Sequence, residues 1–148
     1  YKATWHLRSN DYYSSRNYAS RLIGSKLVFY TPLYLNPWHG IQLSAFPAMR
    51  KWRTGATPEE FKRIAPATRI YRTDEPIDPN QGVALHTVTS CDLAQPELDC
   101  QSTAVLAPPG RVFYVSPNSV FVWTTAWARR GEQASEMRIY MDAAPLYQ

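Results

Sequence analysis

The sequence has few of the residues from which metal centres and phosphate-binding loops are built. Its 148 residues include only 2 Cys, 3 His and 6 Gly. His6, His39 and His86 lie far apart along the chain, so a tetrahedral zinc site of Cys and His is not expected. A glycine-rich phosphate loop and a Gly-x-Ser-x-Gly nucleophile motif are both missing. We therefore expect no cofactor and no metal.

Long apolar runs and dense charge clusters are missing as well. No run reaches the roughly 18 apolar residues that a membrane-spanning helix needs, so we expect no membrane span. The formal net charge of +4 is scattered along the chain without the density of a nucleic-acid-binding arm, which argues against a nucleic-acid partner. The chain starts at Tyr1 without a targeting segment, and we expect it to be a mature or excised product.

Aromatic residues and prolines are abundant instead. Aromatics make up 14% of the residues, and 12 prolines interrupt the chain. Aromatic and β-branched side chains suit a pleated, packed surface, and prolines mark the turns between strands. The composition therefore predicts an all-β fold in a single domain over residues 1–148, which is long enough to bury a core.

Several strands and loops can be placed from local patterns. A hairpin is predicted around Gly24, which supplies the backbone freedom of a tight turn, and Pro32 is expected to end its ladder for lack of an amide hydrogen. Residues 83–90 alternate in character and predict a strand paired antiparallel with residues 102–106. Short strands are also expected at 41–46 and 68–72, and flexible loops at about 36–57 and 73–82.

One short helix is predicted over residues 58–64. Thr57 suits the N-cap position, Pro58 suits the first helical position, and Glu60 completes a capping box. Pro66 follows almost at once and ends the helix.

The strongest hairpin signal lies at residues 112–115 and 120–125, on either side of a turn at 116–119. Neither strand alternates apolar with polar residues, so both faces of the hairpin are expected to be covered by other β-layers. A two-layer sandwich leaves one face of each sheet open, whereas a propeller blade packs between two neighbours. The pattern therefore favours a β-propeller.

Cys91 and Cys100 flank a loop whose ends two predicted strands would bring together. A disulfide between them would stabilise the fold by about 2–3 kcal/mol through restriction of the unfolded chain, and it would imply an oxidising compartment. Two free, half-buried thiols are the alternative. The spacing is too long for a Cys-x-x-Cys redox motif.

Three stretches, in chain order, carry a resemblance to a known family. They are SRLIGSKLVFY at 20–30, LHTVTSCDL at 85–93 with STAVL at 102–106, and GRVFYVS at 110–116 with SVFVW at 119–123. They resemble the C-terminal β-propeller domains of secreted bacterial proteins of largely uncharacterised role. The resemblance implies a secreted or periplasmic β-propeller portion of about three blades of antiparallel strands, completed by the remaining blades of a longer polypeptide or by a partner subunit. It brings no catalytic residue with it.

The tyrosine-rich beginning of the chain is the best candidate for a binding surface. Its rings, hydroxyls and guanidinium group belong to Trp5, Tyr12, Tyr13, Arg16 and Tyr18. This mixture suits recognition of a protein or a sugar, because rings bury area and hydroxyls set direction. Packing of the same rings between blades is the alternative.

Two other features are weaker candidates for chemistry. Asp74, Glu75 and Asp78 lie in a proline-interrupted loop, where a calcium site or a carboxylate pair competes with the simpler interpretation of a solvated turn. His86 lies in the middle of a strand among apolar neighbours, where a hydrogen-bonded structural histidine is expected rather than a catalytic one.

Together these patterns favour an extracytoplasmic, non-enzymatic binding or scaffold module that uses a propeller surface for a protein or glycan partner. The alternative is a part of a hydrolase whose catalytic residues lie on other blades. A basic surface for nucleic acid is a third hypothesis, which a steep dependence of binding on salt would distinguish.

Overall fold

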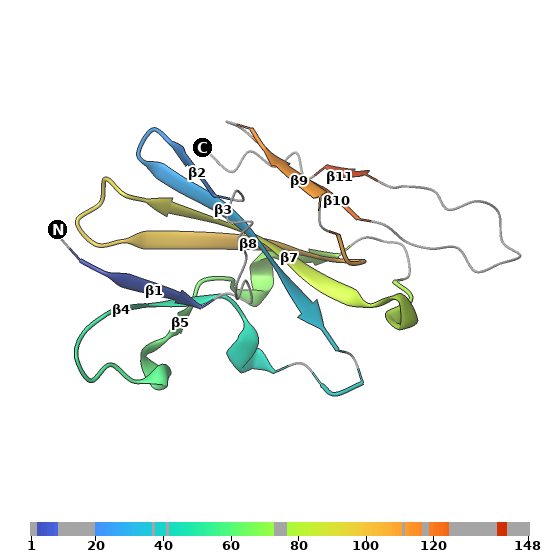
Figure 1. Ribbon diagram of the computed structural model, residues 1–148, viewed down its shortest axis with the longest axis horizontal. Helices are drawn as coiled ribbons and strands as arrows, with labels where there is room; N and C mark the ends of the chain where they lie inside the picture. The colour runs from blue at the N-terminus through green and yellow to red at the C-terminus, as the bar shows by residue number, and fades with distance from the viewer. Residues whose placement is uncertain are drawn as a thin grey trace, which may run out of the picture.

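The computed structural model describes residues 3–8, 20–36, 38–40, 42–72, 77–110, 112–116, 119–124 and 139–141. These residues form three β-sheets (Figure 1), which confirms the predicted all-β class. Every helix in these ranges is a 3-10 turn of three residues. None of them has the length and apolar character that crossing a membrane requires.

The central sheet has five strands and carries most of the buried side chains. In spatial order its strands are β2 (Ser20–Ile23), β3 (Lys26–Leu35), β7 (Val83–Asp92), β8 (Asp99–Ala107) and β6 (Ile70–Arg72). β3 and β7 pair antiparallel along their whole lengths, and β8 pairs antiparallel with β7. Long antiparallel strands in continuous register give the molecule a rigid middle layer.

The predicted hairpin around Gly24 is confirmed. β2 and β3 pair antiparallel on either side of Gly24, whose positive φ of 60° suits glycine. The expected end of the ladder at Pro32 is wrong, because β3 continues to Leu35 and Pro32 pairs with His86. On the other side of β3, β2 reaches only as far as Phe29. Among the described residues no strand pairs with Pro32 on that side of β3, so the missing N–H of the proline costs no ladder hydrogen bond there.

The predicted pairing of 83–90 with 102–106 is also confirmed, and both strands are longer than expected. The strand expected at 68–72 begins later, since a 3-10 turn at Ala67–Arg69 precedes β6. β6 runs parallel to β8.

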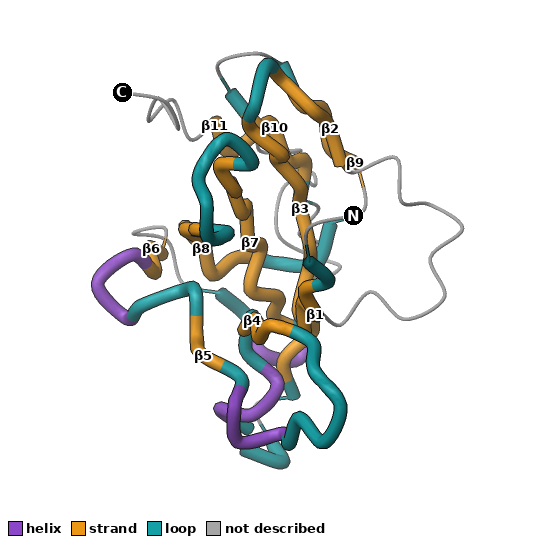
Figure 2. Tube along the Cα trace, turned by 90° about the vertical axis from the view of Figure 1, so that its left-hand side faces the viewer, coloured by secondary structure: helices purple, strands orange, loops and turns teal. Residues whose placement is uncertain are grey.

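Two small sheets pack on opposite faces of the central sheet (Figure 1 and Figure 2). One contains β1 (Trp5–Arg8), β4 (Ala48–Lys51) and β5 (Lys62–Arg63), and the other contains β9 (Val112–Val115), β10 (Val120–Trp123) and β11 (Ile139–Met141). Met49 of the first sheet packs with Phe29, whereas Val120 of the second packs with Val28. Neighbouring residues of a strand point to opposite faces, so β3 is covered on both sides.

The predicted hairpin of β9 and β10 is confirmed, but the expected cover on both of its faces is wrong. Val115 and Val120 pair with each other and are buried against the central sheet. Tyr114 points to the opposite face and is 58% exposed. Its ring lies 6.2 Å from the Phe121 ring, which in turn lies 6.4 Å from the Trp123 ring. Phe121 and Trp123 are partly buried, so this face is open to solvent chiefly at Tyr114.

The predicted helix over 58–64 is wrong beyond its first turn. A 3-10 turn at Pro58–Glu60 is present, and the Thr57 N–H donates to Glu60 Oε1 over 3.0 Å, which is one bond of the predicted capping box. The next residues are extended instead of helical, because they pair with β4 as strand β5.

The segments expected to be loops contain regular structure. Residues 36–57 include β4, together with a 3-10 turn at Leu43–Ala45 in place of the strand expected at 41–46. Residues 77–82 include a 3-10 turn at Pro79–Gln81, and residues 73–76 lie outside the described ranges. β4 belongs to a sheet because it pairs with β1, a partner that lies far back in the sequence.

The predicted propeller blades are not confirmed. None of the three described sheets closes on itself, and the β6–β8 pair is parallel, whereas the blades were expected to be antiparallel. The observed arrangement is a central sheet between two smaller ones.

Candidate functional site

A groove of about 360 Å³ lies between the β1–β4–β5 sheet and the central sheet. We call it the Trp5 groove. Besides the two cysteines, its apolar lining comes from Trp5, Leu7, Leu27, Phe29, Met49 and Leu98. Its volume falls at the lower end of the range of small-molecule pockets, about 300–1,000 Å³.

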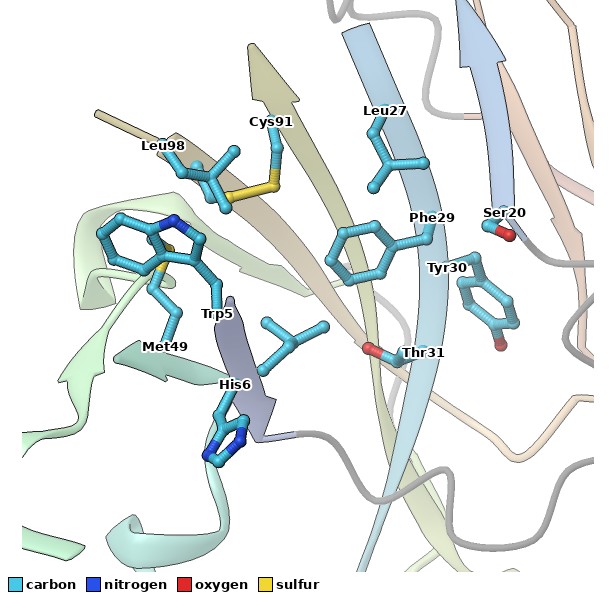
Figure 3. A pocket seen from close by; sticks show the side chains of 12 residues that line it. Trp5, His6, Ser20, Leu27, Phe29, Tyr30, Thr31, Met49, Cys91 and Leu98 are labelled. Atoms are coloured by element: carbon cyan, nitrogen blue, oxygen red, sulfur yellow. A yellow bond between two sulfur atoms is a disulfide. The ribbon is translucent and has the colours of Figure 1, made fainter. Parts of the chain in front are cut away.

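Strand alternation directs these side chains into the groove. In β1, Trp5 points toward the central sheet, whereas His6 points to the other side of its strand (Figure 3). Leu27 and Phe29 are two residues apart on β3, so they share the face that looks toward Trp5. Met49 reaches across from β4 and is 9% exposed. The groove is thus lined by two separate sheets whose apolar faces meet there.

A disulfide between Cys91 and Cys100 forms part of the groove wall (Figure 3). The two residues are directly opposite each other on β7 and β8, with Cα atoms 4.1 Å apart. Both are buried, and Leu98 from the intervening loop packs against them. The predicted disulfide is present, and it anchors the loop that carries Leu98.

One ion pair lies beside Trp5. Lys51 Nζ is 3.1 Å from Glu97 Oε1 and 5.7 Å from the centre of the Trp5 ring. Both charged side chains are more than half exposed, so the pair stabilises the fold by at most about 1 kcal/mol. The Lys51 cation over the ring helps to hold the indole in its orientation.

Polar groups are sparse in the groove. Thr31 and Ser20 contribute hydroxyl groups to the lining. Tyr30 and His6 also border the groove, but the Tyr30 hydroxyl is bonded to His86 and the His6 ring points to the other side of β1. The residues that the structure places in this lining include neither a carboxylate nor a lysine. The groove is therefore built to bury an apolar group with few hydrogen bonds.

The predicted binding residues are only partly described by the structure. Trp5 lies in the groove and is half-buried. The other predicted members of the site fall outside the described ranges: Tyr12, Tyr13, Arg16 and Tyr18.

Sequence reasoning does not single out Leu27, Phe29 or Met49 as site residues. The alternation along residues 26–30 is a signal that Leu27 and Phe29 share a face, but it does not say which sheet they face. Met49 gives no local signal, because its segment reads as a loop.

His86 is buried at 4% exposure and is hydrogen-bonded on both ring nitrogens. Its Nδ1 lies 2.7 Å from the Tyr30 hydroxyl and its Nε2 lies 2.8 Å from the Pro108 carbonyl oxygen, to which it must donate. Burial lowers the pKa of His86, and the bond to Pro108 opposes this in part. The expected hydrogen bonding of His86 is confirmed.

The predicted acidic loop is described only at Asp78. Its carboxylate accepts hydrogen bonds from the Asn80 backbone N–H and the Asn80 side chain, at 3.0 and 2.9 Å. Asp74 and Glu75 lie outside the described ranges. Over the rest of the chain that the structure describes, no three His, Cys, Asp or Glu residues are grouped so that they could hold a metal ion.

Comparisons with models of protein families, curated proteins and solved structures all give no match.

Proposed function

We propose that this domain is a non-enzymatic binding module that works outside the cytoplasm and recognises a protein partner. The Trp5 groove receives an apolar side chain of that partner. The observation that carries the proposal is a cavity of about 360 Å³ walled by apolar side chains from two sheets. Aromatic and aliphatic anchors that fill such pockets supply much of the free energy of protein–protein binding.

The lining favours an apolar side chain over a sugar as the occupant. A sugar ring carries hydroxyl groups on most of its edge, and each one that is buried without a partner costs about 1–3 kcal/mol. Thr31 and Ser20 offer hydroxyl groups to such a ligand, and the Tyr30 hydroxyl is already bonded to His86. An aliphatic or aromatic side chain requires no such partners and gains free energy from the area it buries.

The Cys91–Cys100 disulfide supports the extracytoplasmic part of the proposal. Structural disulfides persist in oxidising compartments and are rare where thiols are kept reduced. We propose on this basis that the protein is secreted or periplasmic. Completion of a propeller by further blades or by a partner subunit also remains a proposal, supported by the antiparallel hairpins at Gly24 and in β9–β10.

The proposal can be tested with peptides selected from a random displayed library against the immobilised, oxidised domain. Leu98→Trp places a larger ring against the groove and should abolish binding of the selected peptides. Leu93→Trp is the matched control, because Leu93 lies in the same loop but is 47% exposed and does not line the groove. Binding is measured by isothermal titration calorimetry.

We expect the selected peptides to share an aromatic or aliphatic anchor, and to bind the wild type and Leu93→Trp with equal affinity. Equal affinity for Leu98→Trp would show that the peptides bind elsewhere and would refute the groove as the site. Tighter binding of neutral oligosaccharides than of any peptide, abolished by Leu98→Trp, would refute the assignment of a protein partner.

A further inference from the structure

The outer surface of the β1–β4–β5 sheet carries a group of arginines. It carries the side chains that alternate away from the Trp5 groove, among them His6, Arg8 and Arg50. Lys51 and Lys62 are opposite Trp5 and Met49 in the ladder and so alternate to the groove side, whereas Arg63 shares the outer side with Ala48. Arg8, Arg50, Arg53 and Arg63 therefore stand against the two carboxylates of Glu59 and Glu60, an excess of two positive charges. We call the surface formed by Arg8, Arg50, Arg53, Trp52 and Phe61 the arginine face.

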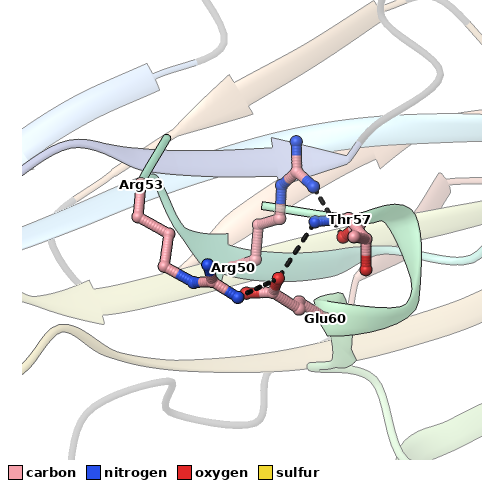
Figure 4. Close-up of polar contacts among 4 residues, drawn as sticks. All are labelled: Arg50, Arg53, Thr57 and Glu60. Carbon is pink, nitrogen blue, oxygen red and sulfur yellow. Dashed lines mark hydrogen bonds and ion pairs between the residues drawn. The ribbon is translucent and has the colours of Figure 1, made fainter. Parts of the chain in front are cut away.

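Arg50 is fixed in place by its neighbours. Its Nη1 donates to the Thr57 carbonyl oxygen over 2.6 Å, and its Nη2 lies 3.3 Å from His6 Nδ1. Figure 4 shows the bond from Arg50 to Thr57 beside the ion pair of Arg53 Nη2 with Glu60 Oε1, which are 2.6 Å apart. The same Glu60 oxygen accepts the Thr57 N–H. These bonds hold two guanidinium groups over the loop that joins β4 to β5.

Phe61 orients a third guanidinium group. The Cζ atoms of Arg8 and Arg50 lie 5.2 and 4.7 Å from the centre of the Phe61 ring, within the range of cation–π contacts. Arg8 Nε and Nη2 both donate to the Phe46 carbonyl oxygen over 3.2 Å. In the described part of the chain Arg8 Nη1 has no partner, so one edge of this preorganised fork remains available to an anion.

An exposed indole lies next to these cations. The Trp52 N–H donates to the Thr4 carbonyl oxygen over 2.9 Å, which continues the β1–β4 ladder by one residue. The alternation that places Arg50 on the outer surface therefore places Trp52 there too. Its side chain is 51% exposed. A flat apolar ring thus lies beside a group of guanidinium forks.

We propose that the arginine face binds an acidic saccharide, with uronate carboxylates on the guanidinium groups and the apolar face of a sugar ring on Trp52. Arginine forks match the planar geometry of carboxylates and hold them with paired hydrogen bonds. An acidic peptide supplies the carboxylates but no flat ring face for the indole. A nucleic acid supplies phosphates and rings, but the disulfide favours an oxidising compartment outside the cytoplasm.

This site is separate from the Trp5 groove. The two lie on opposite sides of the β1–β4–β5 sheet, because Trp5 and Met49 point inward while Arg8 and Arg50 point outward. Failure of one proposal therefore leaves the other standing.

The test is a titration with a short oligogalacturonate, its carboxyl-reduced neutral counterpart, an oligoglutamate of equal charge and a single-stranded oligonucleotide of equal charge. We expect the oligogalacturonate to bind most tightly, and its affinity to fall as salt screens the charges. Equal or tighter binding of the oligoglutamate or the oligonucleotide would overturn the proposal in favour of that ligand. Tight binding of the neutral counterpart, or of none of the four, would also overturn it.

Two substitutions locate the ligand. Trp52→Ala should weaken oligogalacturonate binding about tenfold, as expected when a stacked ring is lost. Trp38→Ala is the matched control, since Trp38 is also exposed, at 72%, but lies in the segment after β3. An equal effect of the two substitutions would overturn the assignment.

Glu60→Gln provides a gain of binding that misfolding cannot imitate. It removes the carboxylate that competes for Arg53, while the amide oxygen can still accept the Thr57 N–H. We expect about two- to fivefold tighter binding of oligogalacturonate, in line with the strength of an exposed ion pair. Unchanged or weaker binding would place the ligand away from these guanidinium groups. Leu98→Trp, which blocks the Trp5 groove, should leave oligogalacturonate binding unchanged.

Discussion

The Tyr30 hydroxyl donates a hydrogen bond to Nδ1 of His86 over 2.7 Å, which links neighbouring strands of the central sheet. The donor role of Tyr30 follows from the other side of the ring, where Nε2–H is used by the Pro108 carbonyl oxygen. A neutral imidazole satisfies both bonds. The pair therefore ties β3, β7 and the segment after β8 together through a single uncharged ring.

The stability of the fold should depend on pH through His86. Burial places the pKa of His86 in the folded protein below that in the unfolded chain, which is about 6.5. The unfolded chain therefore binds more protons in this window, and the free energy of unfolding falls as the pH drops below about 6.5. Above that pH the contribution of His86 is fully present. Urea unfolding from about pH 8 to pH 5 measures the effect.

His86→Gln is the control for this prediction. The glutamine amide can accept from Tyr30 and donate to Pro108 without titrating, so the variant should lose stability less steeply on acidification. Loss of the optimal geometry should still lower the free energy of unfolding at neutral pH by about 1–3 kcal/mol. If wild type and variant respond identically to pH, His86 is not the titrating group.

Two threonines on the face of β7 that looks toward β4 and β5 should respond oppositely to substitution. Thr87 is fully buried, and its hydroxyl oxygen has no hydrogen-bond partner among the described residues. Thr87→Val replaces this hydroxyl by a methyl group of similar size and should raise the free energy of unfolding by about 1 kcal/mol. Thr89 is equally buried, but its hydroxyl is 2.6 Å from the Ser102 hydroxyl. Thr89→Val leaves the buried Ser102 hydroxyl without its hydrogen-bond partner and should lower the free energy of unfolding by about 1–3 kcal/mol.

Chemical denaturation of the two variants side by side checks this contrast. A loss of stability in Thr87→Val as large as that in Thr89→Val would mean that the Thr87 hydroxyl has a partner, such as an ordered water molecule.

The Cys91–Cys100 disulfide should stabilise both the fold and the Trp5 groove. The bond joins residues 9 positions apart in sequence. Replacing both cysteines by alanine should lower the free energy of unfolding by about 2–3 kcal/mol. The double variant should also bind the selected peptides with lower affinity, because the loop that carries Leu98 is no longer linked to β7 by the disulfide. A reducing agent should lower the melting temperature of the wild type and leave that of the double variant unchanged; an equal effect on both would show that the bridge is not the cause.

Gly110 marks the closest approach of the segment after β8 to the end of β10. A Cβ atom at this position would collide with the Trp123 carbonyl oxygen, a backbone atom that cannot swing away. Gly110→Ala should therefore lower the free energy of unfolding by at least about 1–3 kcal/mol. Gly24→Ala is the comparison: it meets no atom within 4 Å and suffers only from its φ of +60°, at a cost of about 1 kcal/mol. A smaller effect at Gly110 than at Gly24 would contradict the packing of β10 on the central sheet.

The sequence predicts those parts of the fold whose signals are local. Gly24 and the strand formers beside it specify a hairpin within a few residues, and the alternation along β7 specifies a strand. β4 could not be placed in the same way, and β6 could not be assigned its parallel partner β8, although a strand was expected at 68–72. Their partners, β1 and β8, lie far along the chain, and a short segment becomes a strand only when its distant partner is present.

Aromatic side chains misled the interpretation of β9 and β10. Tyr and Trp count as apolar in a pattern, yet they tolerate partial exposure because one end of each is polar. Tyr114 therefore lies open on a face that the pattern predicted to be covered. The residues of the candidate site are also only partly recognisable from the sequence. Trp5 stands out by its type, but Leu27 and Phe29 look alike whether they line a groove or a closed core, and only the position of the second sheet distinguishes the two.

The most direct test of the Trp5 groove uses the methyl group of Met49 as a reporter. The chain has 3 Met, so methionine methyl groups labelled with carbon-13 give a simple NMR spectrum in which Met49→Leu identifies the signal. Titration with indole should shift the Met49 signal saturably in the wild type and in Leu93→Trp, and should leave it unmoved in Leu98→Trp. A Met49 signal that does not respond to indole, or that responds equally in Leu98→Trp, would contradict the binding groove.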